Sequence, residues 1–507
     1  MRKRSFLLLT VPALAGIFLA SGELREMPLP PTVRSAADFT AFADGTVPGL
    51  LGRYRVPAVC LGIVEGGAQH LRCYGAPRSG GGRPVDRNSR FGIASVSKTF
   101  TALAVLTLAS RGSLDLDDRV DRHLRSWRFP QGPFDASAVT IRQLLTHTGG
   151  TGVPSYGGAG SPPAAETTRA VLEGLGAGRP PVVLVAAPGS RFQYSGGGYM
   201  VLQLLVEDVS GVPFERFVTE NVFRPVGMRD SSFSWGAGRD GDATGHDVAG
   251  RPLRVHSYGA AMAPGAMVTT ADDMLRFTSA FAGSRLGALL GWPDGVWEKY
   301  TARDQGHYGM GITRSDANGR LLFGHAGTTM GYNARFTASP AEGFGWFLLE
   351  NGNGGVFLNA DLDRLLLAWK TGFVDPRHRI MKVLRAVVAF LAVMLPGLGA
   401  LLLASFAASF VSRRRRWAVA SPVGPAAKVL RLTLAALVSA VIVLWVLVFH
   451  TEMFYPTVTT AWMPYAFRYV TLGVALIALR AALSCVSASK DVDGVARGFR
   501  PTSSASV

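Results

Sequence analysis

The sequence predicts an α/β domain followed by about three transmembrane helices. Three observations support this prediction: an antiparallel hairpin pattern near the N-terminus, an apolar helix pattern that starts at Ser95, and long uncharged runs after residue 383. Of the 507 residues, 48% are hydrophobic and 17% are charged, and the mean hydropathy is +0.22. This balance excludes an intrinsically disordered chain and is unusual for an ordinary soluble enzyme.

The first 22 residues have the pattern of an export signal. Basic residues at positions 2–4 precede an uncharged run over 5–22. The apolar centre of that run is shorter than the ~20 residues that a membrane span needs. We expect residues 1–22 to be a cleaved signal peptide or, alternatively, a retained N-terminal anchor. In both cases the globular domain, residues 38–372, is exported.

Two strands are predicted over residues 57–65 and 68–75, joined by the two-residue turn Gly66-Gly67. In that register Cys60 faces Cys73. Two interpretations stay open: a cross-strand disulfide formed in an oxidising compartment, or two small buried hydrophobic side chains.

Three apolar segments follow the globular domain. Residues 386–411 and 432–449 carry no charge, and residues 469–486 carry one Arg. We expect transmembrane helices at 383–411, 430–450 and 466–487, and a tail at 488–507.

Charge gives these spans an orientation. The loop after the first span contains four consecutive Arg residues, 413–416, and by the positive-inside rule it is cytoplasmic. The sequence therefore predicts a multi-pass inner-membrane protein, in contact with membrane lipid, whose globular domain lies on the extracytoplasmic, or periplasmic, side. Residues 380–507 hold 13 basic and three acidic side chains, which is ten of the 17 net positive charges. Because most of the excess lies beside lipid, we expect no nucleic-acid partner.

Ser95 and Lys98 stand at the start of a predicted helix. Apolar residues recur at helical spacing from Phe100 onward, and Gly112 is a typical stop. Lys98 then lies one turn after Ser95, on the same face. A serine hydroxyl is a poor nucleophile until a base takes its proton. An amine can do so when burial and nearby positive potential lower its pKa from ~10.4.

Lysine is rare in this chain, since only seven of the 52 basic residues are Lys. Lys98 is the only Lys between Lys3 and Lys299. Because Arg does not act as a base in proteins, a lone Lys suggests a position where Arg cannot serve. The alternative is an ion-paired or surface-reaching Lys. The same spacing recurs at Ser487 and Lys490 in the predicted cytoplasmic tail, where we assign it no function.

Four motifs occur in order along residues 38–372. They are Ser95-x-x-Lys98, the stretch LLTHTGG over 144–150, Pro188-Gly189-x-x-Phe192-x-Tyr194-Ser195, and His325-Ala326-Gly327. This arrangement resembles the serine beta-lactamase-related family, which contains class C beta-lactamases, D,D-peptidases, serine esterases and D-aminopeptidases. The resemblance implies an α/β fold of two subdomains: an antiparallel sheet flanked by helices, and an all-helical insertion roughly over 110–310, with Ser95 at their junction.

The resemblance also implies roles for single residues. Ser95 is the expected nucleophile, Lys98 its base, and Tyr194 the phenol that exchanges protons with nucleophile and leaving group. The substrate-binding residues are expected in the strand with His325, Gly327 and Thr328 and at Gly196. There the backbone N–H of Thr328, with that of Ser95, forms an oxyanion hole. His325 stands where many members have Lys, and either binds a substrate carboxylate or holds the tyrosine.

The sequence departs from the family at Gly196, because the usual motif is Tyr-x-Asn and here it is Tyr194-Ser195-Gly196. The missing Asn typically bonds the acylamide carbonyl of the substrate and the catalytic Lys. This change favours an esterase or D,D-peptidase-like enzyme over an efficient beta-lactamase.

The expected enzyme is a serine hydrolase that forms an acyl-enzyme on a small-molecule or peptide-like ester or amide, without cofactor or metal. The nine His form no metal-binding motif. Two alternatives remain: a catalytically impaired, membrane-tethered binding or sensing protein, and a transport component with the outer domain as an accessory. The sequence gives no oligomeric state.

Overall fold

The computed structural model describes residues 28–156, 166–175, 179–235, 241–247, 249–253, 259–292, 308–374, 376–411, 415–417 and 487–489, together with Leu14 and Ile17. The chain divides into two compact units. One is residues 28–374, and the other combines residues 1–27 with 375–507. Each unit is described by itself.

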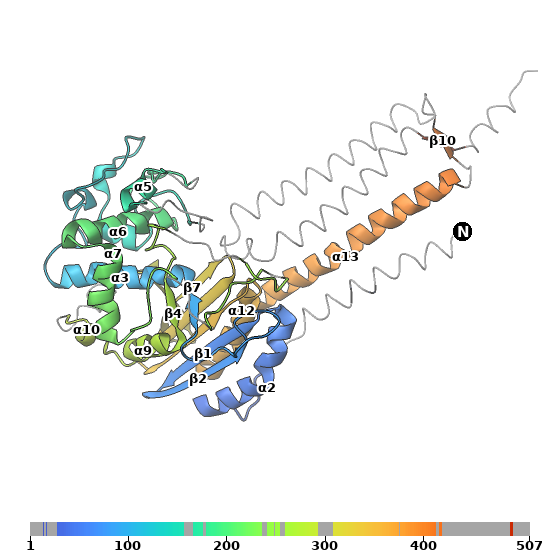
Figure 1. Ribbon diagram of the computed structural model, residues 1–507, viewed down its shortest axis with the longest axis horizontal. Coiled ribbons are helices and arrows are strands. Elements are labelled where there is room, and N and C mark those ends of the chain that lie inside the picture. The colour runs from blue at the N-terminus through green and yellow to red at the C-terminus, as the bar shows by residue number, and fades with distance from the viewer. Residues whose placement is uncertain are drawn as a thin grey trace, which may run out of the picture. The chain divides into compact units, whose positions relative to one another are not determined.

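An antiparallel sheet of seven strands forms the base of the unit 28–374 (Figure 1). The hydrogen-bonded order is β2-β1-β9-β8-β7-β6-β5. The bounds are β1 Ala58–Glu65, β2 Ala68–Gly75, β5 Tyr308–Gly309, β6 Ile312–Ala317, β7 Arg320–Thr329, β8 Tyr332–Ser339 and β9 Phe344–Glu350. Because β1 pairs with β9, the first and last strands of the sheet in the sequence lie side by side, and the chain between β2 and β5 leaves the sheet.

Two tight turns fix the register at the two ends of this sheet. Gly66 and Gly67 both have positive φ, 56° and 86°, and so do Asn318 and Gly319, with 57° and 79°. Positive φ at both central residues is the requirement of the hairpin turn whose twist matches the strands. The N-terminal hairpin predicted from the sequence is therefore confirmed, with strand ends within one residue of the expected ones.

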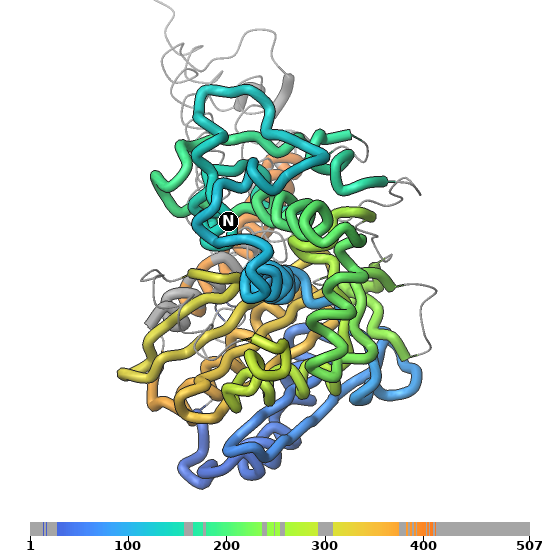
Figure 2. Tube along the Cα trace, turned by 90° about the vertical axis from the view of Figure 1, so that its left-hand side faces the viewer, coloured from blue at the N-terminus to red at the C-terminus, as the bar shows by residue number. Residues whose placement is uncertain are grey.

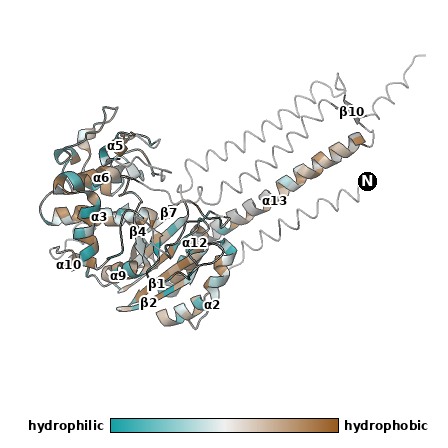
Figure 3. Ribbon diagram, in the orientation of Figure 1, coloured by the Kyte–Doolittle hydropathy of each residue, from teal (hydrophilic) through white to brown (hydrophobic). Residues whose placement is uncertain are grey.

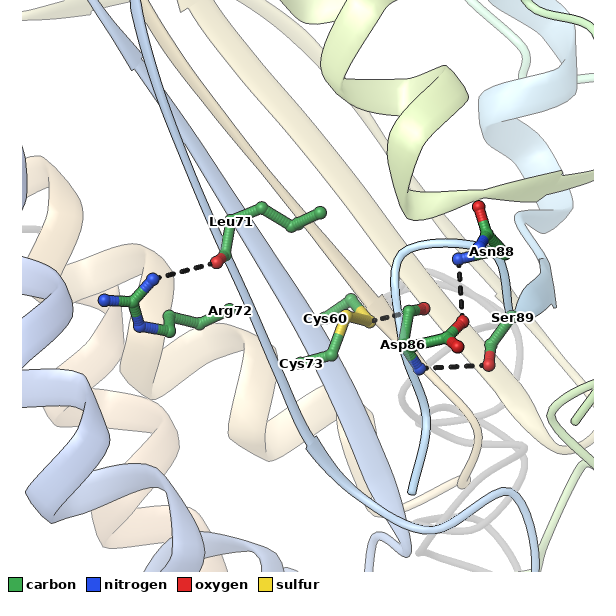
Figure 4. Close-up of a disulfide and its surroundings, with 7 residues drawn as sticks. All are labelled: Cys60, Leu71, Arg72, Cys73, Asp86, Asn88 and Ser89. Carbon is green, nitrogen blue, oxygen red and sulfur yellow. Dashed lines mark hydrogen bonds between the residues drawn. A yellow bond between two sulfur atoms is a disulfide. The ribbon is translucent and has the colours of Figure 1, made fainter. Parts of the chain in front are cut away.

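The cysteines of that hairpin form a disulfide. Cys60 and Cys73 are directly paired across β1 and β2, and their Cα atoms lie 4.1 Å apart (Figure 4). Of the two interpretations that the sequence left open, the structure supports the disulfide.

Helices cover both faces of the sheet. On one face α12 (Gly355–Thr371) packs against β8 and against α2 (Ala36–Tyr54), and Trp346 of β9 donates from Nε1 to Asp363 of α12 at 2.9 Å. On the other face α9 (Ala271–Ala282) lies beneath Gly345, where a Cβ would come 3.0 Å from the Thr278 side chain. Successive residues of a strand point to opposite faces, so these contacts define a helix–sheet–helix arrangement.

A helical subdomain is built on α3 (Ser97–Ser110), which is buried along nearly its whole length. Figure 2 shows the green helices of this subdomain gathered to one side of the strands. Short turns at Val120–Arg122 and Ala136–Ala138 follow it. The remaining helices are α4 Ile141–Leu145, α5 Thr168–Leu172, α6 Gly196–Ser210, α7 Phe214–Val218, α8 Arg224–Val226 and α10 Leu286–Leu289, with a π-helical turn over Thr219–Phe223.

The expected all-helical insertion over 110–310 is too long at its C-terminal end. Strand β4 (Val268–Thr270) returns to pair with β3 (Arg90–Gly92), and the following α9 packs on the large sheet. The chain returns from the helical subdomain by pairing β4 antiparallel to β3. The three residues of β4 are β-branched and buried, which favours a strand at this position.

A row of phenylalanines joins the helical subdomain to the sheet. The ring of Phe100 in α3 lies 5.7 Å from Phe223 and 4.7 Å from Phe277 of α9, and Phe277 lies 5.3 Å from Phe336 of β8. Figure 3 shows apolar residues both in the strands of the sheet and in the helices of the helical subdomain, interspersed with hydrophilic ones. This packing fixes the first turn of α3 above the sheet.

In the second unit, α13 (Pro376–Val411) contains the segment 383–411 that was expected to span a membrane. Among the described residues, no helix is long and apolar enough to cross a membrane. Strand β10 (Arg415–Trp417) pairs with β11 (Ser487–Ser489). Several expected segments lie outside the described residues. They are the signal over 1–22 apart from Leu14 and Ile17, the span 430–450, the span 466–487 apart from Ser487, and the tail 488–507 apart from its first two residues.

Candidate active site

Ser95 lies in a short 3-10 turn, η1 (Ala94–Val96), between β3 and α3. The preceding residue, Ala94, has φ of 47°, a conformation that non-glycine residues rarely adopt and that is concentrated at functional sites. Two contacts hold this turn: Ser97 Oγ donates to the carbonyl of Ala94 at 2.5 Å, and it accepts from the N–H of Met267 at 3.1 Å. The strained turn presents Ser95 half-buried at the start of α3.

Lys98 is buried directly behind Ser95. Only 1% of its surface is exposed, and its Nζ lies 3.1 Å from Ser95 Oγ and donates to the carbonyl of Pro264 at 2.6 Å. Burial lowers the pKa of Lys98 from 10.5 to about 7, because removing an ammonium from water disfavours its charged form. A large share of this amine is therefore neutral at physiological pH and can accept a proton from the hydroxyl beside it.

Tyr194 lies on the other side of the amine. The Lys98 Nζ is 4.9 Å from the ring centroid of Tyr194 and 5.6 Å from that of Tyr199, a buried residue of α6. The predicted triad of Ser95, Lys98 and Tyr194 is thus brought together from two segments of the chain, the start of α3 and the segment before α6. A cation over an aromatic face is stabilised, so the rings offset part of the cost of a buried ammonium.

Gly196 begins α6, directly after Ser195, whose Oγ caps the helix by accepting from the N–H of Gly198 at 3.0 Å. A Cβ atom at position 196 would lie 3.3 Å from the carbonyl oxygen of Pro154, from Cα of Ser155 and from the ring of Tyr156. Segment 154–156 therefore packs tightly beside position 196, so a larger residue there would require a small shift of that segment. The amide group of the usual family Asn is missing here.

Strand β7 runs directly against the nucleophile turn at Gly327. A Cβ atom there would lie 2.1 Å from the carbonyl oxygen of Ile93 and 2.9 Å from the backbone N of Ser95. Only glycine allows this approach. The next residue, Thr328, is half-buried and donates from Oγ1 to Asn333 Oδ1 at 2.8 Å. Because Thr328 directly follows Gly327, its backbone lies next to that of Ser95. The N–H groups of Ser95 and Thr328 are the two that the expected oxyanion hole requires.

His325 is buried in the same strand, two residues before Gly327. Its Nδ1 lies 2.6 Å from the carbonyl oxygen of Ala326, and its Nε2 lies 3.0 Å from the hydroxyl of Tyr308 in β5. Burial, with the positive charge of Lys98, lowers the pKa of His325 to about 3. This imidazole is neutral at physiological pH.

Three groups at the site were not singled out from the sequence. His147 has φ of 58°, accepts from the N–H of Ser195 at its Nδ1 over 3.1 Å, and packs its ring 4.3 Å from that of Tyr194. Tyr308 packs 4.6 Å from His147, and the carbonyl of Pro264 orients Lys98. Only His147 had a sequence signal, its place inside the motif at 144–150.

Burial, with the charge of Lys98, lowers the pKa of His147 well below its usual value, so this imidazole is also neutral. It therefore positions Tyr194 by packing and by the bond from Ser195. Within the described ranges, no group of three or more His, Cys, Asp or Glu side chains could hold a metal ion.

Comparison with known proteins identifies the family. The family profile described as Beta-lactamase matches residues 43–368, which is more than half of the chain. The chain belongs to the beta-lactamase family. Esterase EstB of Burkholderia gladioli is 34% identical over 292 residues, covering 50% of this chain and 73% of the esterase. A beta-lactamase of Lysobacter lactamgenus is 28% identical over 272 residues, 52% of this chain and 65% of the relative.

Solved structures carry the same fold. A D-amino acid amidase from Ochrobactrum anthropi SV3, complexed with L-phenylalanine amide, has a TM-score of 0.53 with 21% identity, covering 66% of this chain and 99% of the amidase. A penicillin-binding protein homologue from Pyrococcus abyssi has a TM-score of 0.50 with 24% identity, covering 62% of this chain and 74% of the homologue. The α/β fold of the beta-lactamase family is therefore shown for the unit of residues 28–374, which is called the catalytic unit below.

The close approach of β7 to η1 gives a direct test of the site in this member of the beta-lactamase family. We expect Gly327→Ala to push the strand away from Ser95 and to slow covalent labelling of Ser95 by a fluorophosphonate by about 100-fold, because displacements near 1 Å cost that much. Ala326→Ser, at an exposed position of the same strand, is the matched control and should label at the wild-type rate. Labelling of a folded Gly327→Ala protein within a few-fold of wild type would contradict this geometry.

The lowered pKa of Lys98 predicts a pH profile. The amine accepts a proton only when neutral, so the labelling rate of Ser95 should rise about tenfold per pH unit below about pH 7 and level off above it. Lys98→Arg, which keeps the charge and cannot act as a base, should lose about 100-fold or more at every pH. A rate that stays flat through neutral pH would show that Lys98 is not the base.

Proposed function

We propose that this protein is a serine hydrolase that forms an acyl-enzyme on Ser95, with esters as its preferred substrates. The observation that carries this proposal is the buried amine of Lys98, 3.1 Å from Ser95 Oγ. A lysine buried this deeply, with the Ser95 hydroxyl and the Pro264 carbonyl as its hydrogen-bond partners, is costly to keep charged, and activation of the neighbouring hydroxyl is a chemical use for it.

The proposed reaction has two halves. Neutral Lys98 takes the proton of Ser95 while Oγ attacks the carbonyl carbon, and the backbone N–H groups of Ser95 and Thr328 stabilise the resulting oxyanion. Tyr194, beside the amine, passes a proton to the leaving group as the carbonyl re-forms and the bond to the leaving group breaks, and it receives in return the proton that Lys98 took from Ser95; this yields the acyl-enzyme and a neutral amine. Water then attacks the ester of Ser95, the acid is released, and the proton returns to Ser95.

Two features favour an ester over a peptide or a beta-lactam. The similarity to an esterase covers 73% of that relative. Gly196 stands in place of the Asn whose amide would bond an acylamide group, and residues 154–156 pack tightly beside it. An ester also has the better leaving group, so it needs less assistance than an amide. We place D,D-peptidase-like activity second and efficient beta-lactamase activity last.

We further propose that the hydrolase works outside the cytoplasm, attached to the inner membrane through the apolar segments after residue 383. The disulfide between Cys60 and Cys73 supports an oxidising compartment, as does the signal-like N-terminus. The pairing of β10 with β11 supports the topology, because it joins the arginine-rich loop to the start of the tail, two segments that the charge rule places on the same side.

A fluorophosphonate probe tests the enzyme proposal. The probe should label the wild-type protein, with Ser95 Oγ displacing fluoride, and Ser95→Ala should abolish that label. The second Ser-x-x-Lys match supplies a control in the same chain: Ser487→Ala should label like wild type. Equal labelling of wild type and Ser95→Ala, or none of either, would reject the acyl-enzyme and favour a binding protein.

Membrane attachment is tested by fractionation of cells that express the full chain. The protein should stay with the membranes after extraction at alkaline pH, and its catalytic unit should be digested by protease added to spheroplasts. Recovery in the soluble fraction, or protection of the catalytic unit in intact spheroplasts, would contradict the proposed location.

A further inference from the structure

The two ring nitrogens of His325 are both occupied. A carbonyl oxygen only accepts hydrogen bonds, so the contact of Nδ1 with Ala326 places the ring proton on Nδ1. Nε2 is then the acceptor, and the hydroxyl of Tyr308 donates to it. No N–H of this ring is left for an anionic group of a substrate.

Tyr308 is held in place by the first turn of α3. Thr99 Oγ1 donates to the carbonyl of Gly311 at 2.8 Å, and a Cβ at Gly311 would collide with the Lys98 carbonyl oxygen at 2.6 Å. The turn after β5 is therefore fixed to the helix that carries Lys98. Tyr308 is thereby fixed as the donor to His325.

The positive groups that act on His325 in the described part of the chain are already engaged. They are Lys98 and Arg335; the other neighbouring titratable groups are the His147 imidazole, whose pKa is lowered well below its usual value by burial, and the hydroxyl of Tyr308, which donates to Nε2. Arg335, on β8, bonds Asn359 at 2.8 Å and pairs with Asp363 at 3.2 Å, both on α12. The Lys98 amine contacts Ser95 and Pro264. A carboxylate placed beside His325 would lose its water without gaining a cation, which is strongly unfavourable.

Aromatic rings, and no unengaged cationic side chain, surround His325 and Lys98 in the described part of the site. Phe192 is 49% exposed, and its ring lies 6.1 Å from Tyr308 and 5.9 Å from His147. The ring of Tyr308 lies 6.1 Å from that of Tyr194. These rings form a wall that runs from the Lys98 amine to the surface, and such a wall favours an apolar or aromatic group.

We propose that the site selects neutral esters with an apolar or aromatic acyl group and discriminates against acyl groups that carry a carboxylate, with Tyr308 and His325 as the specificity-determining pair. This inference rests on the proposed acylation of Ser95. It names the substrate class for that reaction: the acyl chain lies along the wall of Phe192, Tyr194 and Tyr308, and the neutral imidazole closes the wall beside Gly327.

Matched substrates test the selection. Mono-4-nitrophenyl glutarate and its methyl ester share the scissile bond and differ in one charge. For the full-length protein, kcat/KM should be on the order of 30-fold or more higher for the methyl ester, the size expected for an unpaired buried charge. Fluorophosphonate labelling of Ser95 is measured on the same sample. If Ser95 labels and the free acid is turned over equally well or better, the inference fails while the proposed function stands; if Ser95 does not label, both fail.

A variant pair tests the role of Tyr308. Tyr308→Phe keeps the ring and removes the hydroxyl that occupies Nε2, so the preference for the methyl ester should fall several-fold, and more at acidic pH, where the freed nitrogen binds a proton. The ratio of the two substrates does not depend on the fraction of folded protein. Tyr332→Phe is the control, because its buried hydroxyl bonds the carbonyl of Ala243 instead and its ratio should match wild type. An unchanged ratio in Tyr308→Phe would overturn the assignment of this pair.

Discussion

The burial of one amine is the constraint on which the rest of the site depends. Lys98 has 1% of its surface exposed, and its pKa is near 7 because water is excluded around it. Water exclusion requires the rings of Tyr194 and Tyr199, the loop that carries Pro264, and an α3 that is buried along nearly its whole length. The two imidazoles nearest to the amine are neutral for the same reason, so the low dielectric that prepares the base also fixes the charge state of the pocket.

The strand β7 and the turn that carries Ser95 are joined by a close contact between their backbones, not by side chains. Gly327 lets β7 pass against the nucleophile turn, and the αL conformation of Ala94 turns the chain so that Ser95 faces that strand. The packed rings of Phe223, Phe100, Phe277 and Phe336 hold α3 against the sheet. The hydrophobic core therefore maintains the close contact between β7 and the Ser95 turn. Rigid packing beneath a strained turn is a common way to hold a reactive group in one geometry.

Local patterns predicted local features well. The Gly66-Gly67 turn fixed the register of the hairpin and the pairing of Cys60 with Cys73, and the apolar spacing after Ser95 placed Lys98 beside it. The end of the helical insertion was wrong, because the return of β4 to β3 depends on tertiary pairing over a long sequence separation. Tyr308 and the carbonyl of Pro264 had no sequence signal, since a two-residue strand and a backbone oxygen leave no periodic pattern. The oxidation state of the cysteines also needed the structure, because facing positions fit paired thiols and a disulfide equally well.

The order of the strands has a consequence for biogenesis. The N-terminal hairpin is completed in the sheet only by β9, which is made after every other strand of that sheet, and Ser95 gains its neighbour Gly327 only when β7 has formed. Such long-range pairings make folding slow compared with a chain of local contacts. A nascent chain that contains Ser95 and Lys98 but lacks the C-terminal strands therefore has no assembled nucleophile. The geometry at Ser95 therefore depends on nearly the whole of residues 28–374 having been synthesised.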